Sequence, residues 1–490
     1  QRHAWFLRLG AVGYTRTLVL TAAPPGSGLW MFKARMALSA RVQAALPGET
    51  GGFAAAIMTG DRSGISQDTL RALRVSNLAH LLAISGLHMG LLSGFVFAAF
   101  RLAFAAVPAV GLRVPAKKLS ALMALPVAAV YLGLSGGNVA TERAFVMVAV
   151  ALVAVMTDRR VLSLRAVAVA AVIVLVLRPE ALLGPGFQMS FAATTALVAV
   201  FGWLRDTKVS FGPRWARGAA AVVISSTVAG LATAPVAAAH FNQFAHYGLL
   251  ANLASVPLMG VLVMPAAVMA ACLLPFGLEA IALWVMGQGL GWILGVAHWV
   301  SGLDGARGTV VSPDAHVLPL MAFGALFVAL WQGRFRFVGS VPMVLAVGLW
   351  IEAERPDVLI SDTGALVGVM TPDGRALNRP RGGGFVALNW LENDGDAASQ
   401  ERAAIRWQDL PTEAIRILAL RGKAEAQNLT DCRGYDWIVL NTPAVHPLSC
   451  TVFDPPRLRD TGAIALYTTP QGISQKTARQ ITGVRLWNSQ

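Results

Sequence analysis

The sequence predicts a polytopic α-helical membrane protein with about ten spans, some of them broken or re-entrant, followed by a small soluble α/β domain. Three observations predict this fold class. Apolar residues make up 55% of the 490 residues and charged residues only 13%, whereas soluble chains carry about 25% charge. Long apolar runs recur as far as residue 351. Beyond that point, short β-rich runs separated by turns take their place.

A transmembrane helix needs about 20 predominantly apolar residues. Runs of this kind predict spans at 79–105, 119–135, 139–156, 161–178, 187–204, 218–239, 246–274, 279–300, 317–332 and 337–351. In the first run we expect two half-helices joined near Ser85-Gly86, because both residues loosen a helix. The run 246–274 contains Pro257 and Pro265, which leaves open one long span or a re-entrant half-helix followed by a span.

Charge is divided unevenly along the chain. The tail from residue 351 carries 15 basic and 16 acidic residues, which leaves 25 basic and 10 acidic residues for the first 350. The net charge of +14 therefore belongs to the membrane part, where short basic loops favour the cytoplasmic side. Basic loops also suit a nucleic-acid partner, but membrane topology is the simpler explanation.

The basic residues also predict the orientation of the spans. They follow odd-numbered spans: Arg113, Lys117 and Lys118 after the first, Arg159 and Arg160 after the third, Arg205, Lys208, Arg214 and Arg217 after the fifth, and Arg334 and Arg336 after the ninth. By the positive-inside rule these loops are cytoplasmic. Both the N-terminal segment and the tail then lie outside, in the periplasm if the cell has one. Two crossings within 246–274 would reverse the tail.

The N-terminal 50 residues contain no predicted span. The apolar alternation from Ala11 to Leu20 is typical of a β-strand, and we expect it to be the last strand of a domain that is otherwise absent. We therefore expect the natural beginning of the chain to be missing. A helix of about 29–45 follows, carrying Lys33, Arg35 and Arg41. Basic amphipathic helices of this type lie on the membrane surface.

The tail has the pattern of a compact α/β domain. Strands are expected at Val358–Ser361, Ala365–Met370, Phe385–Asn389, Ile415–Leu420, Trp437–Asn441 and Ile464–Tyr467, with helices around 397–408 and 474–481. Its single histidine, His446, excludes a histidine-rich metal cluster, and the chain has no Walker A motif, so we predict no catalytic residue, metal or cofactor. Cys272 lies in an apolar run and is expected to pack inertly. Cys432 and Cys450 are compatible with a disulfide in an oxidising compartment, which their spacing does not establish.

The most informative segment is His80-Leu-Leu-Ala-Ile-Ser-Gly-Leu-His88, at the start of the first apolar run. A polar group in hydrocarbon costs several kcal/mol unless it faces protein or water. Two histidines do not make a zinc site, and the H-E-x-x-H pattern is absent. These residues therefore either line a cavity or form helix–helix hydrogen bonds.

Other polar residues fall at corresponding depths in the predicted spans. They are Thr141, Glu142 and Arg143 in the third span, Gln188 and Ser190 in the fifth, His240 and His246 between the sixth and seventh, and Asn252 in the seventh. Individually, each is more often a helix–helix contact than a site. Together, on one half of the membrane, they predict an outward-facing polar vestibule.

Several motifs, in this order, resemble the ComEC-type competence proteins, inner-membrane channels for DNA uptake during natural transformation. They are Thr59-Gly-Asp-Arg62, the segment from His80 to His88, Gly136 with Thr141-Glu-Arg-Ala144, Pro185-Gly-Phe-Gln-Met-Ser-Phe191, and Ala239-His-Phe241 with Leu249-Leu-Ala-Asn252 before Pro257. The resemblance covers about 50–340. The His80–His88 segment is its most specific part, and the Phe187–Phe191 block supports it independently.

The resemblance implies a domain organisation. Residues 1–50 would be a remnant of an external OB-like domain with an interfacial helix, and residues 51–351 the transmembrane competence domain. Residues 352–490 resemble a degenerate metallo-β-lactamase-like domain. The metal-binding histidines of that domain are missing here, so the resemblance does not imply nuclease activity. In this family context, the positions of Cys432 and Cys450 favour a periplasmic disulfide.

The resemblance also implies a function: translocation of single-stranded DNA through the inner membrane into the cytoplasm. The expected channel lining is His80, Ser85, His88, Arg143, Gln188, Ser190, His240, His246 and Asn252, with Phe187, Phe241 and Phe244 nearby for stacking. Membrane lipid, a DNA-receptor protein and a cytoplasmic ATPase are the expected partners. Two alternatives stay open, a secondary transporter of a smaller solute and a non-transporting envelope scaffold.

Overall fold

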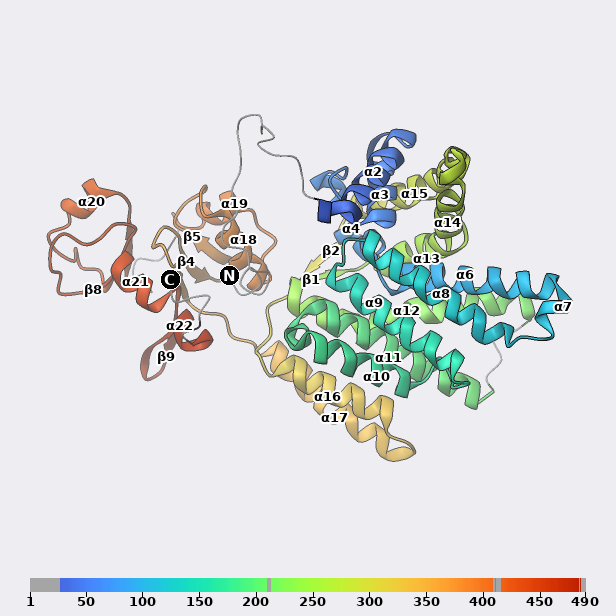
Figure 1. Ribbon diagram of the computed structural model, residues 1–490. Helices are drawn as coiled ribbons and strands as arrows, with labels where there is room; N and C mark the ends of the chain where they lie inside the picture. The colour runs from blue at the N-terminus through green and yellow to red at the C-terminus, as the bar shows by residue number, and fades with distance from the viewer. Residues whose placement is uncertain (1–26, 209–212, 409, 411–415, 484, 486–490) are drawn as a thin grey trace. The chain divides into compact units, whose positions relative to one another are not determined.

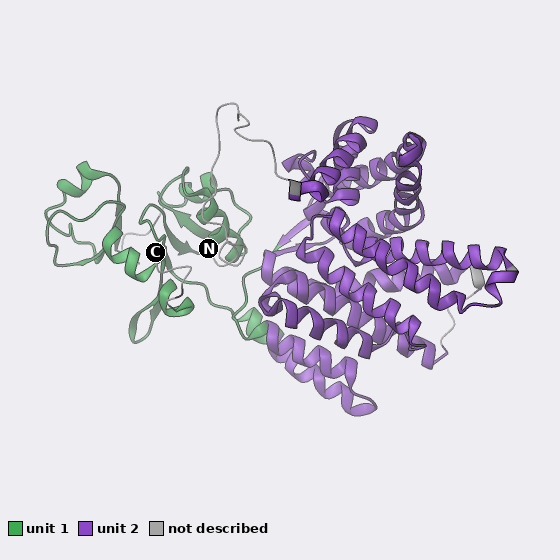
Figure 2. Ribbon diagram, in the orientation of Figure 1, with its two compact units in different colours: residues 1–24, 309–317, 347–490 green, residues 25–308, 318–346 purple. Residues whose placement is uncertain are grey.

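The computed structural model describes residues 27–208, 213–408, 410, 416–483 and 485. Its contacts divide the chain into a helical unit, 25–308 with 318–346, and an α/β unit that includes 309–317 and 347–490 (Figures 1 and 2). The strand expected between Ala11 and Leu20 lies outside the described residues. The two units are therefore considered separately.

The helical unit begins with four helices that precede the long apolar ones: α2 (Trp30–Ala45), α3 (Gly48–Thr59), α4 (Gln67–Val75) and α5 (Ala79–Leu82). The helices that follow are α6 (Gly86–Ala106), α7 (Pro108–Gly111), α8 (Ala116–Leu134), α9 (Val139–Met156), α10 (Leu164–Leu177), α11 (Pro185–Asp206), α12 (Arg214–Phe241), α13 (Gly248–Leu258), α14 (Met264–Leu273), α15 (Glu279–Ser301), α16 (Val317–Leu330) and α17 (Ser340–Ile351). Two short strands, β1 (Gln243–Ala245) and β2 (Arg307–Thr309), pair with each other.

Within the described residues, eight helical segments are long and apolar enough to cross a membrane. They are α6, α8, α9, α11, most of α12, the run Gly248–Phe276, α15 and the run Arg334–Ile351. The expected spans at 161–178 and 317–332 correspond to α10 and α16, apolar helices of 14 residues each. The chain is thus a multi-pass membrane protein.

The two ambiguous runs differ in the structure. The first is broken: α5 ends at Leu82, Ala83 and Ser85 have extended backbone, and α6 begins at Gly86. The run 246–274 has no re-entrant break, because a π-helical turn, Met259–Val263, joins α13 to α14. Proline lacks an N–H and crowds the preceding turn, so a π turn just after Pro257 is a natural way to continue the helix.

The main core of the helical unit surrounds α3, which the sequence analysis did not predict. All residues from Gly51 to Thr59 are buried, Phe53 and Ile57 are completely enclosed, and α3 packs against α2, α15 and α5. Gly52 permits this packing, since a Cβ there would lie 2.3 Å from the Gly64 carbonyl oxygen. A helix that is apolar on all sides belongs inside a bundle, even when it is too short to be a span.

The α/β unit contains two sheets. The strands are β3 (Val358–Ile360), β4 (Val367–Thr371), β5 (Gly374–Leu377), β6 (Ile417–Leu420), β7 (Trp437–Leu440), β8 (Thr451–Phe453), β9 (Ile464–Thr469) and β10 (Gly472–Thr477). An antiparallel sheet has the order β10-β9-β3-β4-β5, and a parallel sheet has the order β6-β7-β8. Its helices are α18 (Gly384–Asn393), α19 (Gln400–Ile405), α20 (Lys423–Gln427), α21 (Pro455–Thr461) and α22 (Ala478–Thr482).

One sequence prediction for this unit is wrong, and a second is right over half of its length. The expected strand Phe385–Asn389 is part of helix α18, which buries Ala387 and Leu391 at a four-residue spacing and exposes Phe385. In the expected helix 474–481, the first half is wrong, because residues 474–477 belong to strand β10, which forms a hairpin with β9. The second half, 478–481, is helical as expected and belongs to α22, which the Thr477 side chain caps.

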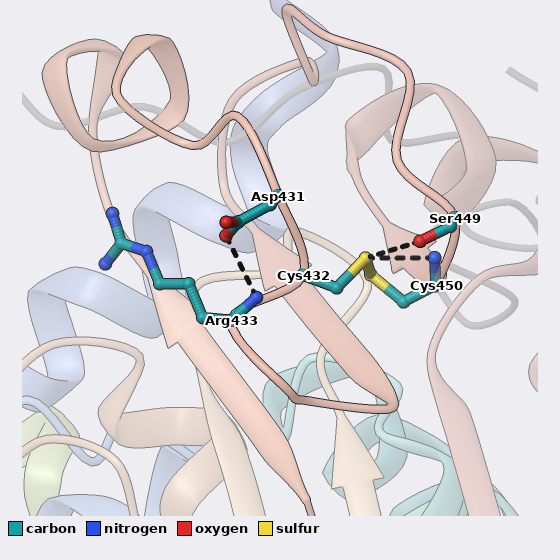
Figure 3. The surroundings of a disulfide bond; sticks show 5 residues. All are labelled: Asp431, Cys432, Arg433, Ser449 and Cys450. Atoms are coloured by element: carbon teal, nitrogen blue, oxygen red, sulfur yellow. Dashed lines mark hydrogen bonds between the residues drawn. A yellow bond between two sulfur atoms is a disulfide. The ribbon is translucent and has the colours of Figure 1, made fainter.

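A disulfide joins Cys432 and Cys450, whose Cα atoms lie 6.0 Å apart (Figure 3). Nearby, the Asp431 carboxylate accepts a hydrogen bond from the Arg433 backbone N–H at 3.1 Å. Both cysteines pack against a cluster that includes Ala426, Leu429, Ile438 and Leu440. The bond therefore ties the loop before β7 to the start of β8, across 18 residues of sequence.

Candidate functional site

His88 is completely buried in the first turn of α6. The Ser85 backbone N–H donates to His88 Nδ1 at 3.3 Å, and the Ser85 hydroxyl lies 3.1 Å from the same nitrogen. Because Nδ1 accepts the backbone bond, a neutral ring carries its proton on Nε2. That Nε2 has no partner that meets hydrogen-bond geometry among the described residues, although the Leu81 carbonyl lies near the ring. One nitrogen thus caps the helix while the other remains available as a donor.

Arg143, in the first turns of α9, is 9% exposed. Its guanidinium lies against Gly186, where a Cβ would be 2.9 Å and 3.0 Å from the two terminal nitrogens. The neighbouring Glu142 faces elsewhere, since it forms a bidentate pair with Arg178 at 2.7 and 2.9 Å. Within the described part of the chain, Arg143 has no carboxylate partner and its Nε no hydrogen bond. Its charge can therefore serve an anion.

Gln188 connects the start of α11 with the end of α12. Its amide nitrogen donates to the Leu182 carbonyl at 3.0 Å, and its amide oxygen lies 2.9 Å from His240 Nε2. Ser190, two residues further along α11, is half-buried. Phe187 is core rather than lining, because it packs against Phe191 with ring centroids 4.4 Å apart.

The other predicted lining residues have separate neighbours. His80 is exposed, with Nδ1 3.0 Å from the Asn77 carbonyl oxygen. His246 is also exposed, and its Nδ1 lies 2.7 Å from the Gly305 carbonyl oxygen. Asn252, on α13, has a buried amide oxygen with no partner among the described residues. The structure thus joins Ser85 to His88, Gln188 to His240 and Arg143 to Gly186, and among the described residues no hydrogen bond links His80, His246 or Asn252 to these pairs.

Three further buried hydroxyls lack a hydrogen-bond partner in the described part of the chain: Ser93, Thr141 and Ser255. The sequence analysis left Ser93 and Ser255 out and did not include Thr141 in the lining. Ser255 lies three residues after Asn252, which places both on one face of α13. Most serines and threonines in helices bond to a preceding carbonyl, as Ser120 does to Ala116 at 2.7 Å. The sequence does not reveal which serines and threonines fail to form this bond.

Arg35 joins two motif segments that are far apart in sequence. It donates to the Thr59 carbonyl at 2.6 Å, and a Cβ at Gly136 would lie 2.2 Å from one of its terminal nitrogens. Gly60 and Gly136 both have positive φ, at 75° and 79°. A Cβ at Gly60 would lie 2.5 Å from the Ser135 carbonyl oxygen. The end of α3 therefore rests directly on the turn between α8 and α9.

Replacing Gly60 with alanine should lower the thermal stability of the chain in detergent. The positive φ alone costs roughly 1 kcal/mol, and the contact with the Ser135 oxygen adds to it because a backbone atom must move. Gly137→Ala is the matched control, since Gly137 also has a positive φ, 63°, but nothing within 4 Å of its added Cβ. A Tm for Gly60→Ala no lower than that of Gly137→Ala would contradict this contact.

A hollow of about 270 Å³ lies between α6 and the segment formed by the π turn and α14. It is lined by Gly90, Leu91, Gly94, Phe95, Gly260, Met264, Pro265 and Val268. Its lining is apolar, so it does not gather the polar groups described above. Across the described residues, no three His, Cys, Asp or Glu side chains are placed to hold a metal ion.

Comparisons with known proteins agree on one family. Residues 57–335 match the family model described as Competence protein. A 230-residue segment is 30% identical to ComE operon protein 3 of Bacillus subtilis (strain 168), and it covers 47% of this chain and 27% of that relative. The chain thus spans little more than a quarter of the length of the curated relative it matches. No solved structure matches the chain.

Proposed function

This chain belongs to the competence protein family, and from that premise we propose that it is an inner-membrane channel that carries single-stranded DNA into the cytoplasm. One observation carries the proposal: buried polar atoms of His88, Arg143 and Asn252 lack protein partners among the described residues, on helical segments long enough to span a membrane. Leaving such an atom unpaired costs about 1–3 kcal/mol. Water and a polar strand passing by would satisfy these atoms.

The chemistry of the substrate fits these residues. DNA carries one negative charge per nucleotide and cannot cross about 30 Å of hydrocarbon unaided, so it needs a hydrated path with cationic and hydrogen-bonding walls. In this proposal Arg143 binds phosphate through its guanidinium fork. The Nε2–H of His88 donates to phosphate or base oxygens. Asn252, Ser255, Ser93 and Thr141 supply neutral hydrogen-bonding groups along the path.

The remaining predicted residues are proposed to form the outer entrance. Gln188, Ser190 and His240 shape one side of it, and Ser85 orients His88. Exposed His80 and His246, with half-exposed Phe241 and Phe244, offer rings on which bases could stack. The entrance is proposed to face the periplasm, together with the N-terminal segment and the tail. A DNA-receptor protein there and an ATPase in the cytoplasm are the proposed partners.

The competing functions make different predictions about the polar groups. A non-transporting scaffold needs them mutually satisfied, as Glu142 and Arg178 are. The unpartnered atoms of His88 and Arg143 favour a conduit instead. A secondary transporter of a smaller solute would use the same groups but would not move a polymer.

The deciding experiment measures labelled DNA in the cytosol of a deletion strain that is complemented with the full-length gene. We expect one labelled strand to become resistant to external nuclease and to fractionate with the cytosol. DNA that accumulates in the periplasm of complemented cells, with none in the cytosol, would overturn the translocation proposal. Uptake equal to that of the complemented strain in cells without the gene would overturn it as well.

The periplasmic location of the tail predicts that Cys432 and Cys450 are oxidised in cells, because disulfides persist in the periplasm and are rare in the cytosol. In a Cys272→Ser background, a membrane-impermeant maleimide should label spheroplasts only after reduction. Labelling of Cys432→Ser spheroplasts without reduction is the positive control, since it frees Cys450. No labelling in either case would place the tail in the cytoplasm.

A further inference from the structure

Loops from both sheets of the α/β unit meet at one edge. Arg421 directly follows β6, whose last residue, Leu420, pairs with Leu440 at the end of β7. Gly364, in the turn after β3, fits against that end, since a Cβ there would lie 2.2 Å from the Leu440 carbonyl oxygen. The neighbouring Leu366 lies beside Gly383, in the loop that follows β5. The segments after β3, β5, β6 and β7 therefore converge.

Arg379 lies in this loop after β5, with its guanidinium against the backbone of two glycines. A Cβ at Gly382 would be 2.8 Å from its Nη2, and one at Gly383 would be 3.4 Å away. Gln400 holds the loop by donating to the carbonyls of Arg379 and Gly382 at 3.3 and 2.9 Å. The Nε of Arg379 is buried and unpaired in the described part of the chain. The guanidinium of Arg379 is therefore fixed in place, and its Nε has no hydrogen-bond partner among the described residues.

Arg379 and Arg421 are among the arginines of the α/β unit for which the described residues provide no ion pair. Arg355 and Arg375 pair with Asp394, Arg406 with Asp396 and Arg381 with Glu401, whereas neither Arg379 nor Arg421 has a carboxylate partner among the described residues.

Two acids near this edge accept hydrogen bonds from the backbone, and a third, Asp362, is exposed in the turn after β3. Glu425 accepts from the Arg421 N–H at 2.7 Å, and Asp454 accepts from the N–H groups of Ala444 and Arg457. Burial, and next the charge of Arg421, lower the pKa of Arg379. The two guanidinium groups therefore lie close enough for their charges to repel each other.

We propose that this edge binds the phosphate groups of single-stranded DNA through Arg379 and Arg421. A guanidinium matches phosphate with two parallel hydrogen bonds. The choice of ligand rests on the proposed function, which makes single-stranded DNA the substrate of the chain. The tail then contributes DNA binding without a metal and without cleavage.

The test uses the full chain in detergent and a fluorescein-labelled 20-nucleotide oligothymidylate, with anisotropy measured from 50 to 200 mM NaCl. Arg379→Gln with Arg421→Gln should weaken binding by about tenfold. The slope of log K against log salt should fall by about 1.4, since each phosphate contact on a single strand contributes about 0.7. Arg459→Gln with Lys476→Gln is the control: both residues are exposed and the same charge is removed.

Two further measurements keep the outcome clear. Arg379→Lys with Arg421→Lys keeps the charge and should recover the salt slope but only part of the affinity. Formation of the Cys432–Cys450 disulfide in every variant reports that the unit has folded. If the glutamine pair binds as the control does, the phosphate site is wrong.

The uptake assay separates this inference from the proposed function. A wild-type chain that imports DNA while the glutamine pair binds normally would refute the site and leave translocation standing. Loss of binding in the glutamine pair, with no import by wild type, would refute translocation and leave the site standing.

Discussion

Replacing Arg143 with alanine is expected to reduce DNA entry into the cytosol by about 10- to 100-fold while the chain still inserts into the membrane. A hydrogen bond to a charged group contributes about 1.5–3 kcal/mol, and each 1.4 kcal/mol of barrier changes a rate tenfold. Arg143 is buried, has no carboxylate partner in the described part of the chain and lies against Gly186. Its loss would remove a fixed cation from the proposed path.

The control for this prediction is Arg101→Ala, which removes an exposed arginine from the C-terminal half of α6. It should leave uptake unchanged. Arg143→Lys keeps the charge but loses the planar fork, and it should fall between alanine and wild type. Equal detergent Tm values for the variants would exclude a folding defect. Normal uptake in both Arg143→Ala and His88→Ala would remove these residues from the path.

The spans could be predicted from the sequence because a helix that crosses the hydrocarbon needs about 20 mostly apolar residues, and such runs are visible in the composition. The sequence also located the break before α6, since Ser85 and Gly86 both weaken a helix there. It missed α3 for a physical reason. A helix of 12 residues is too short to be a span, and its three glycines disfavour a helix in isolation. Packing on all sides of Phe53 and Ile57 supplies the stability that local sequence lacks.

The polar residues of the candidate site were predicted, but their pairing was not. Gln188 and His240 are 52 residues apart, and Glu142 and Arg178 are 36 residues apart. Only tertiary packing decides that Glu142 turns to Arg178 and leaves Arg143 without a carboxylate among the described residues. Sequence also does not tell which serine hydroxyls bond to their own helix: Ser120 donates to a carbonyl of its helix, and Ser255 does not.

Replacing Asp394 with alanine is expected to unfold the α/β unit or bring it close to unfolding. Asp394 is 1% exposed and accepts from Arg375, which is fully buried, and from Arg355 at 2.8 Å. Arg375 also donates to the Pro356 and Gly368 carbonyls, so it cannot turn to water without breaking those bonds. Breaking a buried ion pair by removing one partner costs about 3–5 kcal/mol, a large part of the 5–15 kcal/mol that typically stabilises a domain.

Limited proteolysis of the full chain in detergent measures this effect, because cleavage within 352–490 reports opening of the unit. Glu401→Gln is the control: its pair with Arg381 is exposed, and exposed pairs contribute at most about 1 kcal/mol. Joint replacement of Asp394 by leucine and Arg375 by methionine should restore part of the protection, since apolar residues can replace a buried pair at little cost. Such a rescue would show that Asp394→Ala opens the unit because it leaves the Arg375 charge without a partner, and not because it removes side-chain volume. Wild-type resistance in Asp394→Ala would instead mean that this charge is solvated in the folded unit.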